Sequence, residues 1–355
     1  MDSPQLPIRF AVIGVGHIGR RHASLIAAHP EAQLVALCDP LGKTEIQWPE
    51  GVDESIACYK RLDELLSRQA FDVAVVCTPN GLHASQGLQC LRAGRNVVIE
   101  KPMALRTQDC DALIALARQR QLHVFGVMQN RYSPAAAWLK ELVAGQHVGQ
   151  ILQVHLDCFW NRDDRYYRLA DGSPHAWHGD ATLDGGVLYT QFAHFIDLLC
   201  WTFGDIQVLH AQFANQTHTA IHDFADTGMV HFSLPNGGLG SLTFSTAIWD
   251  RNFESTLTAI GTRGTVKLGG QYMNELQYCH VEGLLAPALP PSAPPNNYGP
   301  YQGSAANHHF VIDNVVDVLR GRAPVATTAE EGRAVVKVIE DIYRVSGVQE
   351  PGRTS

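Results

Sequence analysis

The sequence predicts an α/β fold: a doubly wound parallel sheet, followed by an α+β domain with a large, open, mainly antiparallel sheet. In the first third of the chain, short apolar runs alternate with helical patterns, as in βαβ units. From about residue 206, long alternating runs separated by glycine-rich turns replace the helical patterns. We therefore expect a first domain over residues 1–128, a second over 129–325, and a C-terminal helical segment over 326–355 that packs back on the first domain.

Each predicted element is an apolar run with a recognisable end. Ile8 to Ile13 is a buried-strand pattern that ends in glycines, and the helical pattern after it must stop before Pro30. Gly94 is placed to end a later helix. The other strands are predicted at 33–38, 71–77, 96–99, 123–127, 151–160, 229–233, 239–246, 255–260 and 264–268, and the other helices at 83–93, 107–120, 134–144, 307–319 and 328–345.

Composition narrows the class of protein. The 355 residues include 27 Lys and Arg against 35 Asp and Glu, and a net charge of −8 without a basic run argues against nucleic-acid binding. No apolar run reaches the roughly 18 residues that span a bilayer, and residues 1–10 lack the pattern of a signal peptide. The 8 cysteines form no Cys-x-x-Cys pair, so neither a zinc knuckle nor a disulfide framework is expected. We expect a soluble cytoplasmic protein with reduced thiols and no nucleic-acid or membrane partner.

A Gly-x-Gly-x-x-Gly motif lies between the first predicted strand and the first helix. Gly14 permits a tight turn, Gly16 lets the backbone approach a pyrophosphate, and Gly19 lets the helix pack on the strand. Asp39 ends the next strand, where its carboxylate can accept from both hydroxyls of a ribose and would repel a 2′-phosphate. We therefore predict a Rossmann domain that binds NAD rather than NADP. The predicted cofactor contacts in this segment are Gly14, Gly16, His17, Ile18, Gly19 and Asp39.

Three polar clusters follow later strands of this domain. They stand at the carboxyl ends of those strands, which is where ligands bind in parallel α/β sheets. The clusters are Thr78-Pro79-Asn80, Glu100-Lys101-Pro102 and Gln129-Asn130-Arg131.

These motifs resemble those of the Gfo/Idh/MocA oxidoreductases, the family of glucose–fructose oxidoreductase and inositol dehydrogenase. The motifs G-x-G-x-x-G-x-x-H, T-P-N-x-x-H and E-K-P end at His22, His83 and Pro102. A D-G-G at 184–186 and then His194 follow at the family's spacing. The resemblance covers essentially the whole chain and implies the fold predicted above, with NAD as the cofactor.

By this resemblance, Lys101 lies beside the nicotinamide and contacts the hydroxyl that is oxidised, and His194 is the candidate general base. Hydride transfer from an alcohol leaves a proton that a positioned base must take. The alternative for Lys101 is a surface salt bridge to Glu100, and the alternative for His194 is a satisfied helix residue. The cofactor contacts that the resemblance adds are Thr78, Pro79, Asn80, His83, Glu100, Lys101 and Gln129.

One departure from the family pattern concerns Thr190. Many members carry an Asp at this position, four residues before the histidine, and a hydroxyl cannot orient or charge-stabilise His194 as a carboxylate would. Together with Q-N-R-Y-x-P at 129–134, W-x-G at 177–179 and Gln191, this departure makes the sequence more similar to one branch of the family. That branch oxidises UDP-N-acetylglucosaminuronate at C3 for bacterial surface polysaccharides.

A polar, aromatic and basic loop, 161–180, precedes the predicted catalytic helix. Arginine offers a bidentate fork to a carboxylate or phosphate, and the aromatic residues offer faces for a sugar or uracil. A solvated loop or a subunit contact is the alternative. The predicted substrate contacts are Lys101, Asn130, Arg131, Arg162, Tyr167, Trp177, Thr190, Gln191 and His194.

Partners and metals follow from the second domain. One face of its sheet must be buried, so we expect a homo-oligomer, a dimer or tetramer, formed through that sheet. The proline-rich segment 287–300 is expected at the surface, as a lid or a partner contact. The residues His218, His222, Asp223 and Asp226 do not lie on one helical face, so no metal is predicted.

We therefore predict an NAD-dependent sugar dehydrogenase that oxidises a secondary hydroxyl. The best candidate for that hydroxyl is C3 of a UDP-linked N-acetylated uronic acid. A dehydrogenase of the same family for aldoses or inositols is the first alternative. A non-catalytic NAD-binding protein is the second, and the presence of both Lys101 and His194 argues against it.

Overall fold

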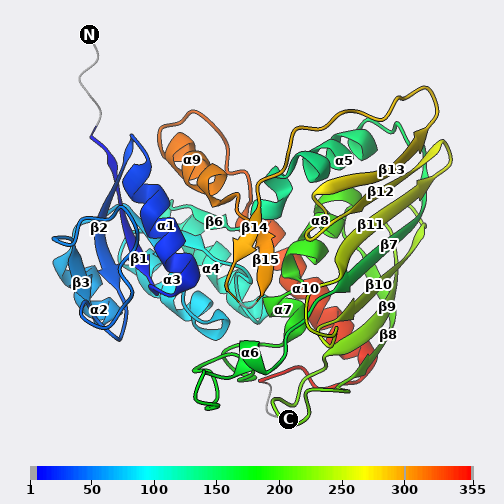
Figure 1. Ribbon diagram of the computed structural model, residues 1–355. Helices are drawn as coiled ribbons and strands as arrows, with labels where there is room; N and C mark the ends of the chain where they lie inside the picture. Colours follow the sequence, from blue (N-terminus) through cyan, green and yellow to red (C-terminus); the bar gives the residue numbers. More distant parts are fainter. Residues whose placement is uncertain (1–5, 300, 353–355) are drawn as a thin grey trace. The chain divides into compact units, whose positions relative to one another are not determined.

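The computed structural model describes residues 6–299 and 301–352 (Figure 1). Contacts between residues divide the chain into two compact units, and each is described by itself. The first unit ends at Val127 and includes His308–Arg333. The second comprises Met128–Asn307 and the segment that begins at Ala334. The C-terminal segment predicted over 326–355 is therefore shared between the units, with only its first residues in the first unit.

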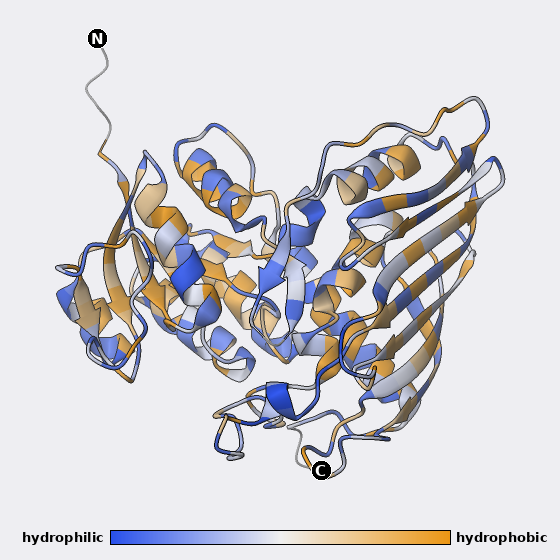
Figure 2. Ribbon diagram, viewed as in Figure 1, coloured by the Kyte–Doolittle hydropathy of each residue, from blue (hydrophilic) through white to orange (hydrophobic). Residues whose placement is uncertain are grey.

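The first unit is built on a six-stranded parallel sheet with the order β3-β2-β1-β4-β5-β6. This is the strand order of a doubly wound sheet, and it confirms the predicted fold class. Strand β4 is buried along its whole length, and Figure 2 shows the strands of this sheet as mainly hydrophobic. The strands are β1 Ile8–Ile13, β2 Ala32–Cys38, β3 Ala57–Tyr59, β4 Val73–Val76, β5 Asn96–Ile99 and β6 Val124–Gly126.

The helices of the first unit include two packed pairs, α1 with α9 and α3 with α4. In α1 the buried residues Gly19, His22, Ala23 and Ile26 recur at helical spacing, so one face of the helix is covered. The short elements α2 and β3 have no clear periodicity, and the sequence analysis missed both. The helices are α1 His17–Ala28, α2 Leu62–Arg68, η1 Asn80–Leu82, α3 His83–Arg92, α4 Thr107–Arg120 and α9 His308–Leu319.

The second unit is built on a seven-stranded sheet with the order β13-β12-β11-β7-β10-β9-β8. Only β7 and β10 pair in parallel, so the predicted mainly antiparallel sheet is confirmed. The strands are β7 Ile151–Phe159, β8 Gln207–Ala214, β9 Thr227–Ser233, β10 Leu239–Ser245, β11 Glu254–Gly261, β12 Gly264–Gly269 and β13 Glu275–Val281. The helices are η2 Gln129–Tyr132, α5 Pro134–Ala144, α6 Asp164–Tyr167, α7 Val187–Thr190, α8 Ala193–Phe203 and α10 Ala329–Ser346, of which α10 begins in the first unit.

Helices α5, α8 and α10 lie on one face of this second sheet (Figure 1). Alternate strand residues such as Val230 and Phe232 are fully buried. Their neighbours on the other face include Met229 and Leu239, which are 60% and 55% exposed. The strands therefore have one buried and one open face, as a half-covered antiparallel sheet requires. The predicted homo-oligomer through this sheet remains a prediction.

The proline-rich segment is partly paired as β-structure. Pro295–Asn297 forms β14, which pairs antiparallel with β15, Gln302–Ala305, and Pro300 lies outside the described residues. The Ser292 hydroxyl donates to the Asn274 carbonyl at 2.9 Å, and a groove lies between this segment and β13. The predicted surface excursion is therefore anchored near one edge of the second sheet. In the part of the chain that the structure describes, no helix has the length and apolar character needed to cross a membrane.

Replacing Met229 with Glu tests whether the open sheet face forms the predicted oligomer. A charge placed in an apolar contact loses its hydration, so M229E should shift an oligomeric wild type toward the monomer in size-exclusion chromatography with light scattering. The control is L41E, which changes a leucine of the first unit that is 52% exposed. If M229E keeps the mass of an oligomeric wild type, this face is not the contact.

Candidate functional site

The glycine motif forms the turn between β1 and α1. Gly14 has a φ of +84°, and a Cβ on Gly14 would lie 2.7 Å from the Cys77 carbonyl oxygen. A Cβ on Gly19 would lie 1.8 Å from the Gly14 carbonyl oxygen, so only glycine fits at either position. A Cβ on Gly16 would meet nothing within 4 Å, and no side chain caps the first turn of α1. The N-terminus of α1 therefore has an open approach for an anionic group, which fits the pyrophosphate of NAD.

Asp39 stands directly after β2 and is joined to this turn. Its carboxylate accepts from the backbone N–H of Val15 at 2.8 Å and from that of Leu41 at 3.1 Å. Two oxygens of a carboxylate have further lone pairs, and Asp39 is only partly buried, so it can still accept from a ribose. His17 is exposed beside Gly16, and Ile18 is half-buried.

His83 joins the two polar clusters that follow β4 and β5. Its Nδ1 lies 2.7 Å from the Pro102 carbonyl oxygen, and its Nε2 lies 2.7 Å from the Thr78 carbonyl oxygen. Burial lowers the pKa of His83, although both carbonyl contacts oppose this shift. A neutral imidazole has one N–H and can donate to only one of the two carbonyls. In this first unit Asn80 is also buried, and the Thr78 hydroxyl donates to Gln86 at 2.7 Å.

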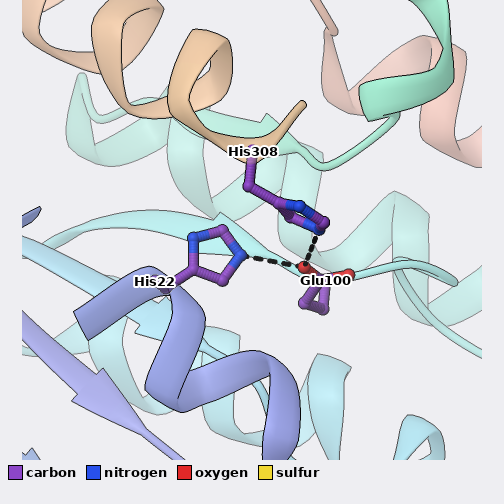
Figure 3. Close-up of side chains that lie close together, drawn as sticks. All are labelled: His22, Glu100 and His308. Carbon is purple, nitrogen blue, oxygen red and sulfur yellow. Dashed lines mark hydrogen bonds and ion pairs between the residues drawn. The ribbon is translucent and has the colours of Figure 1, made fainter. Parts of the chain in front are cut away.

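Glu100 is a buried residue at the end of β5, not part of a surface salt bridge. Its Oε1 lies 2.8 Å from His22 Nε2 and 3.5 Å from His308 Nε2 (Figure 3). Its Oε2 accepts from the Lys101 backbone N–H at 3.2 Å. Burial by itself raises the pKa of Glu100, but the contacts with the two histidines hold it well below its usual value. The carboxylate is therefore ionised, and it is joined to α1, to α9 and to the backbone of Lys101. No role for His22 or His308 is predicted from the sequence, because residues so far apart along the chain form no motif with a recognisable spacing.

His194 lies in α8 of the second unit and is 2% exposed. Its Nε2 is 3.2 Å from the side-chain nitrogen of Gln129. Gln129, predicted as a cofactor contact, therefore orients the imidazole of the candidate base.

Arg131 is paired inside the second unit. Its Nε and NH2 lie 2.8 and 2.6 Å from the two carboxylate oxygens of Asp197, and both side chains are buried. Its guanidinium carbon also lies 5.2 Å from the centre of the Trp201 ring. The guanidinium of Arg131 was predicted to bind the substrate, and it instead makes two hydrogen bonds to Asp197. This pairing favours a structural role for Arg131.

Thr190 is likewise directed to a neighbouring carboxylate. Its hydroxyl contacts the side chain of Asp184 and lies 3.0 Å from the Asp184 carbonyl oxygen. Asp184 is 1% exposed, and its carboxylate also accepts from the backbone N–H of Gly179 at 2.9 Å and of Gly186 at 3.3 Å. The D-G-G segment is thus organised around one buried carboxylate, and the predicted substrate role of Thr190 remains a prediction.

Several predicted site residues have buried polar atoms without a hydrogen-bond partner among the described residues. These atoms include Gln129 Oε1, Asn130 Nδ2, Arg162 Nε, Gln191 Oε1 and the Tyr167 hydroxyl. Asn130 is oriented from its other side, since its Oδ1 accepts from the Ala305 backbone N–H at 3.2 Å. A buried polar group that stays unsatisfied costs about 1–3 kcal/mol. These atoms are therefore available to bind a polar ligand or water.

The loop of residues 161–180 divides into a buried and a more exposed part. Arg162 is 3% exposed, its guanidinium lies 4.8 Å from the ring centres of both Trp160 and Tyr301, and it donates to the Gln302 carbonyl oxygen at 3.1 Å. These internal contacts favour a structural role for Arg162 over the predicted substrate role. Trp177 is half-buried, with its ring 4.1 Å from that of His178.

Of the two neighbouring histidines of the second unit, His218 is held by a hydrogen bond and His222 by ring contacts. His218 Nδ1 lies 2.9 Å from Asp226, and the ring of His218 is 5.2 Å from that of His222. Burial lowers the pKa of His222 to about 4. A different group, His22, Glu100 and His308, has the ligand atoms of a possible metal site close together, within 4.8 Å.

The open glycine turn, the acidic residue after β2 and the polar cluster after β5 define a dinucleotide-binding oxidoreductase of the α/β class. Models of one family match both units: residues 8–127 match the oxidoreductase family with the NAD-binding Rossmann fold, and residues 137–267 match the GFO/IDH/MocA C-terminal domain. The chain belongs to the Gfo/Idh/MocA oxidoreductase family, and its first unit is that family's NAD-binding Rossmann domain.

Two solved structures are similar over almost the whole chain. The WlbA dehydrogenase from Bordetella pertussis, in complex with NADH and UDP-GlcNAcA, is 28% identical, with 98% of this chain and 100% of that chain covered and a TM-score of 0.81. The WlbA dehydrogenase from Chromobacterium violaceum, with the same ligands, is 26% identical, with 99% and 98% covered and a TM-score of 0.83.

Curated relatives match over shorter stretches. The UDP-N-acetylglucosamine 3-dehydrogenase of Acidithiobacillus ferrooxidans is 28% identical over 247 residues, which is 68% of each chain. An uncharacterised oxidoreductase of Synechocystis is 30% identical over 211 residues, 59% of this chain, and the match spans about half (54%) of that relative's length.

Replacing Asp39 with Ala tests the cofactor preference. The change removes the acceptor for the ribose hydroxyls and the charge that repels a 2′-phosphate, so the preference for NAD over NADP should narrow. Affinity for NAD should also fall, because the Val15 N–H loses its acceptor. The measurement is the dissociation constant of each cofactor for wild type and D39A, and an unchanged ratio would contradict the role of Asp39.

Acidification should destabilise the protein through His308. Burial lowers the pKa of His308 from 6.5 to about 4, so the unfolded chain binds a proton in this pH window and the folded chain does not. The contribution of neutral His308 to the free energy of unfolding is therefore fully present above pH 6.5 and is lost as the pH falls toward 4. Between pH 7 and 5 the free energy of unfolding should fall by about 2 kcal/mol from this group. Denaturant unfolding at both pH values should show a smaller pH dependence in H308L than in wild type. The control H309L, at the exposed neighbouring histidine, should keep the wild-type pH dependence.

Proposed function

We propose that this protein is an NAD-dependent dehydrogenase for a secondary hydroxyl of a sugar, and that its substrate is a UDP-linked N-acetylated uronic acid oxidised at C3. The observation that carries the proposal is the similarity over 98% of the chain to a WlbA dehydrogenase crystallised with NADH and UDP-GlcNAcA. The proposal includes a cytoplasmic role in surface-polysaccharide biosynthesis. It is supported by the Q-N-R-Y-x-P and W-x-G motifs and by the residue at position 190, which is Thr.

The cofactor half of the proposed site lies in the first unit. The N-terminus of α1 and the glycine turn would hold the diphosphate, and Asp39 would accept from the ribose. When bound, NAD⁺ supplies the acceptor for a hydride. The loops after β4 and β5, joined through His83, would border the nicotinamide end, because ligands of such sheets bind at the carboxyl ends of the strands.

The substrate half lies in the second unit. The buried amides of Asn130 and Gln191 and the Tyr167 hydroxyl present polar atoms that have no hydrogen-bond partner among the described residues. A nucleotide sugar has many hydroxyl, amide and carboxylate groups, and its binding would satisfy such atoms. Gln129 holds the His194 ring in one orientation, which a general base requires.

The proton chemistry is assigned to Lys101 and His194. Lys101 Nζ would donate a hydrogen bond to the oxygen of the reacting hydroxyl, and the imidazole of His194 would take the hydroxyl proton as the C–H bond breaks and the hydride passes to its acceptor. The two residues come from different units, Lys101 from the first and His194 from the second. The proposal requires that both act on the same hydroxyl. Neither residue would then be catalytically sufficient alone.

A ligand screen tests the substrate class. Thermal unfolding is measured with NAD, NADP, UDP, UDP-GlcNAc and UDP-N-acetylglucosaminuronate, because ligands of the native state raise its stability by mass action. A shift with NAD and a further shift with the uronate support the proposal, and oxidation at C3 is then followed as NADH formation. A shift with NAD alone would count against a UDP-sugar and would direct the assays to free aldoses and inositols.

Lys101→Ala and His194→Asn should each lower turnover by about 10²-fold or more, the usual scale for lost acid–base catalysis. NAD affinity should stay near the wild-type value in both, since neither change removes a diphosphate or ribose contact. The control is Lys337→Ala, at a lysine whose side chain is 53% exposed. Turnover of K101A or H194N at the wild-type rate would exclude the assigned role of that residue.

A further inference from the structure

Three buried side chains meet in the first unit, next to the segment that carries Lys101. Glu100 lies at the end of β5, His22 comes from α1, and His308 is the first residue of α9, the helix with which the chain returns to the first unit (Figure 3). The side chains of the two histidines are fully buried, and that of Glu100 is 6% exposed. We call this group the His–Glu–His cluster.

The cluster contains one negative charge. Glu100 is ionised, and burial keeps His308 neutral, with its pKa lowered to about 4. A buried carboxylate requires hydrogen-bond donors in place of water. His22 supplies one at 2.8 Å, the Lys101 backbone N–H supplies one at 3.2 Å, and His308 Nε2 approaches to 3.5 Å.

The contact with the Lys101 N–H connects the cluster to the proposed chemistry. Glu100 Oε2 binds the backbone of Lys101 on one side, and the His83 ring contacts the Pro102 carbonyl oxygen on the other. The short segment that carries the Lys101 side chain is therefore held at the peptide group before Lys101 and at the peptide group after Pro102. A change in the position of Glu100 would move this segment directly.

Two histidines and a carboxylate could also bind a metal ion such as zinc. Metal-bound histidines almost always donate their other ring N–H to a carboxylate, a carbonyl or water. Among the described residues, His22 Nδ1 and both ring nitrogens of His308 have no hydrogen-bond partner. The 2.8 Å distance between His22 Nε2 and Glu100 Oε1 is that of a direct hydrogen bond. These features favour a hydrogen-bonded cluster over a metal site.

We propose that His22 and His308 are positioning residues for Lys101, and that they act by holding the Glu100 carboxylate that binds the Lys101 backbone N–H. The catalytic consequence rests on the proposed function, because it assumes that Lys101 acts on the substrate. The structural consequence, that His308 fixes the Lys101 segment, does not depend on it.

The test uses His308, since α9 lies outside the glycine turn. H308L removes the contact with Glu100, H308Q keeps an N–H donor at this position, and H309L makes the same change at the exposed neighbour. Hydrogen exchange of the NAD-loaded protein, followed by mass spectrometry, reports on the peptide that includes the Lys101 amide. Exchange should be faster in H308L, close to wild type in H308Q, and unchanged in H309L.

Kinetics with the sugar substrate provide the second readout. H308L should lower kcat by about tenfold, because small misplacement of a catalytic group is costly, while the KM and the NAD dissociation constant stay within about twofold. H308Q should recover most of the loss. If H308L does not fold, E100Q takes its place: it keeps the size of the side chain, removes its charge, and should show the same faster exchange and the same split between kcat and KM.

The outcomes separate the two proposals. Unchanged exchange of the Lys101 peptide, or faster exchange with a wild-type kcat, would overturn the positioning role. Faster exchange in a protein that oxidises no sugar would leave the positioning of the segment intact and overturn the proposed function. Elemental analysis tests for a metal. If the purified wild type holds one equivalent of metal that H308L loses and H309L keeps, the cluster is a metal site and the positioning role is wrong.

Discussion

The structure of the first unit depends on how the buried, ionised Glu100 carboxylate is stabilised without water. An ionised carboxylate removed from water costs several kcal/mol unless nearby donors replace the solvent. Here the donors come from α1 and from the backbone that follows β5, and His308 Nε2 of α9 approaches the carboxylate to 3.5 Å. The glycine-turn helix, the E-K-P segment and the returning chain are therefore fixed by one charge. The geometry of the cofactor half of the site follows from this electrostatic requirement as much as from the parallel sheet.

The second unit satisfies its buried charges in the same way. Arg131 pairs with Asp197, and the Asp184 carboxylate is surrounded by backbone N–H groups and a hydroxyl. These internal pairs leave a small remainder of buried polar atoms, among them those of Asn130 and Gln191. These atoms are already removed from water in the folded protein. A ligand that forms hydrogen bonds with them therefore gains affinity. The paired groups instead stabilise the unit.

Arginines show why residue type and place along the chain are incomplete guides to a binding site. Arg131 and Arg162 both have the fork that recognises a carboxylate or phosphate, and the sequence analysis assigned both to the substrate. In the structure, one is paired with Asp197 and the other lies against Trp160 and Tyr301. Gln129, predicted as a cofactor contact, contacts His194 with its amide nitrogen, while its Oε1 has no partner among the described residues. For the two arginines, partners distant in sequence determine what the side chain contacts.

The sequence by itself determined the two sheets, the glycine turn and the acidic residue after β2. These features follow from local rules: apolar periodicity, turn geometry and the steric need for glycine at 14 and 19. Only the tertiary structure decided how the buried polar groups pair. His22 and Glu100 are 78 positions apart, and His308 is farther still. Hydrogen bonds between such residues form because the folded chain must satisfy each buried charge, and no local pattern encodes which donor will do so.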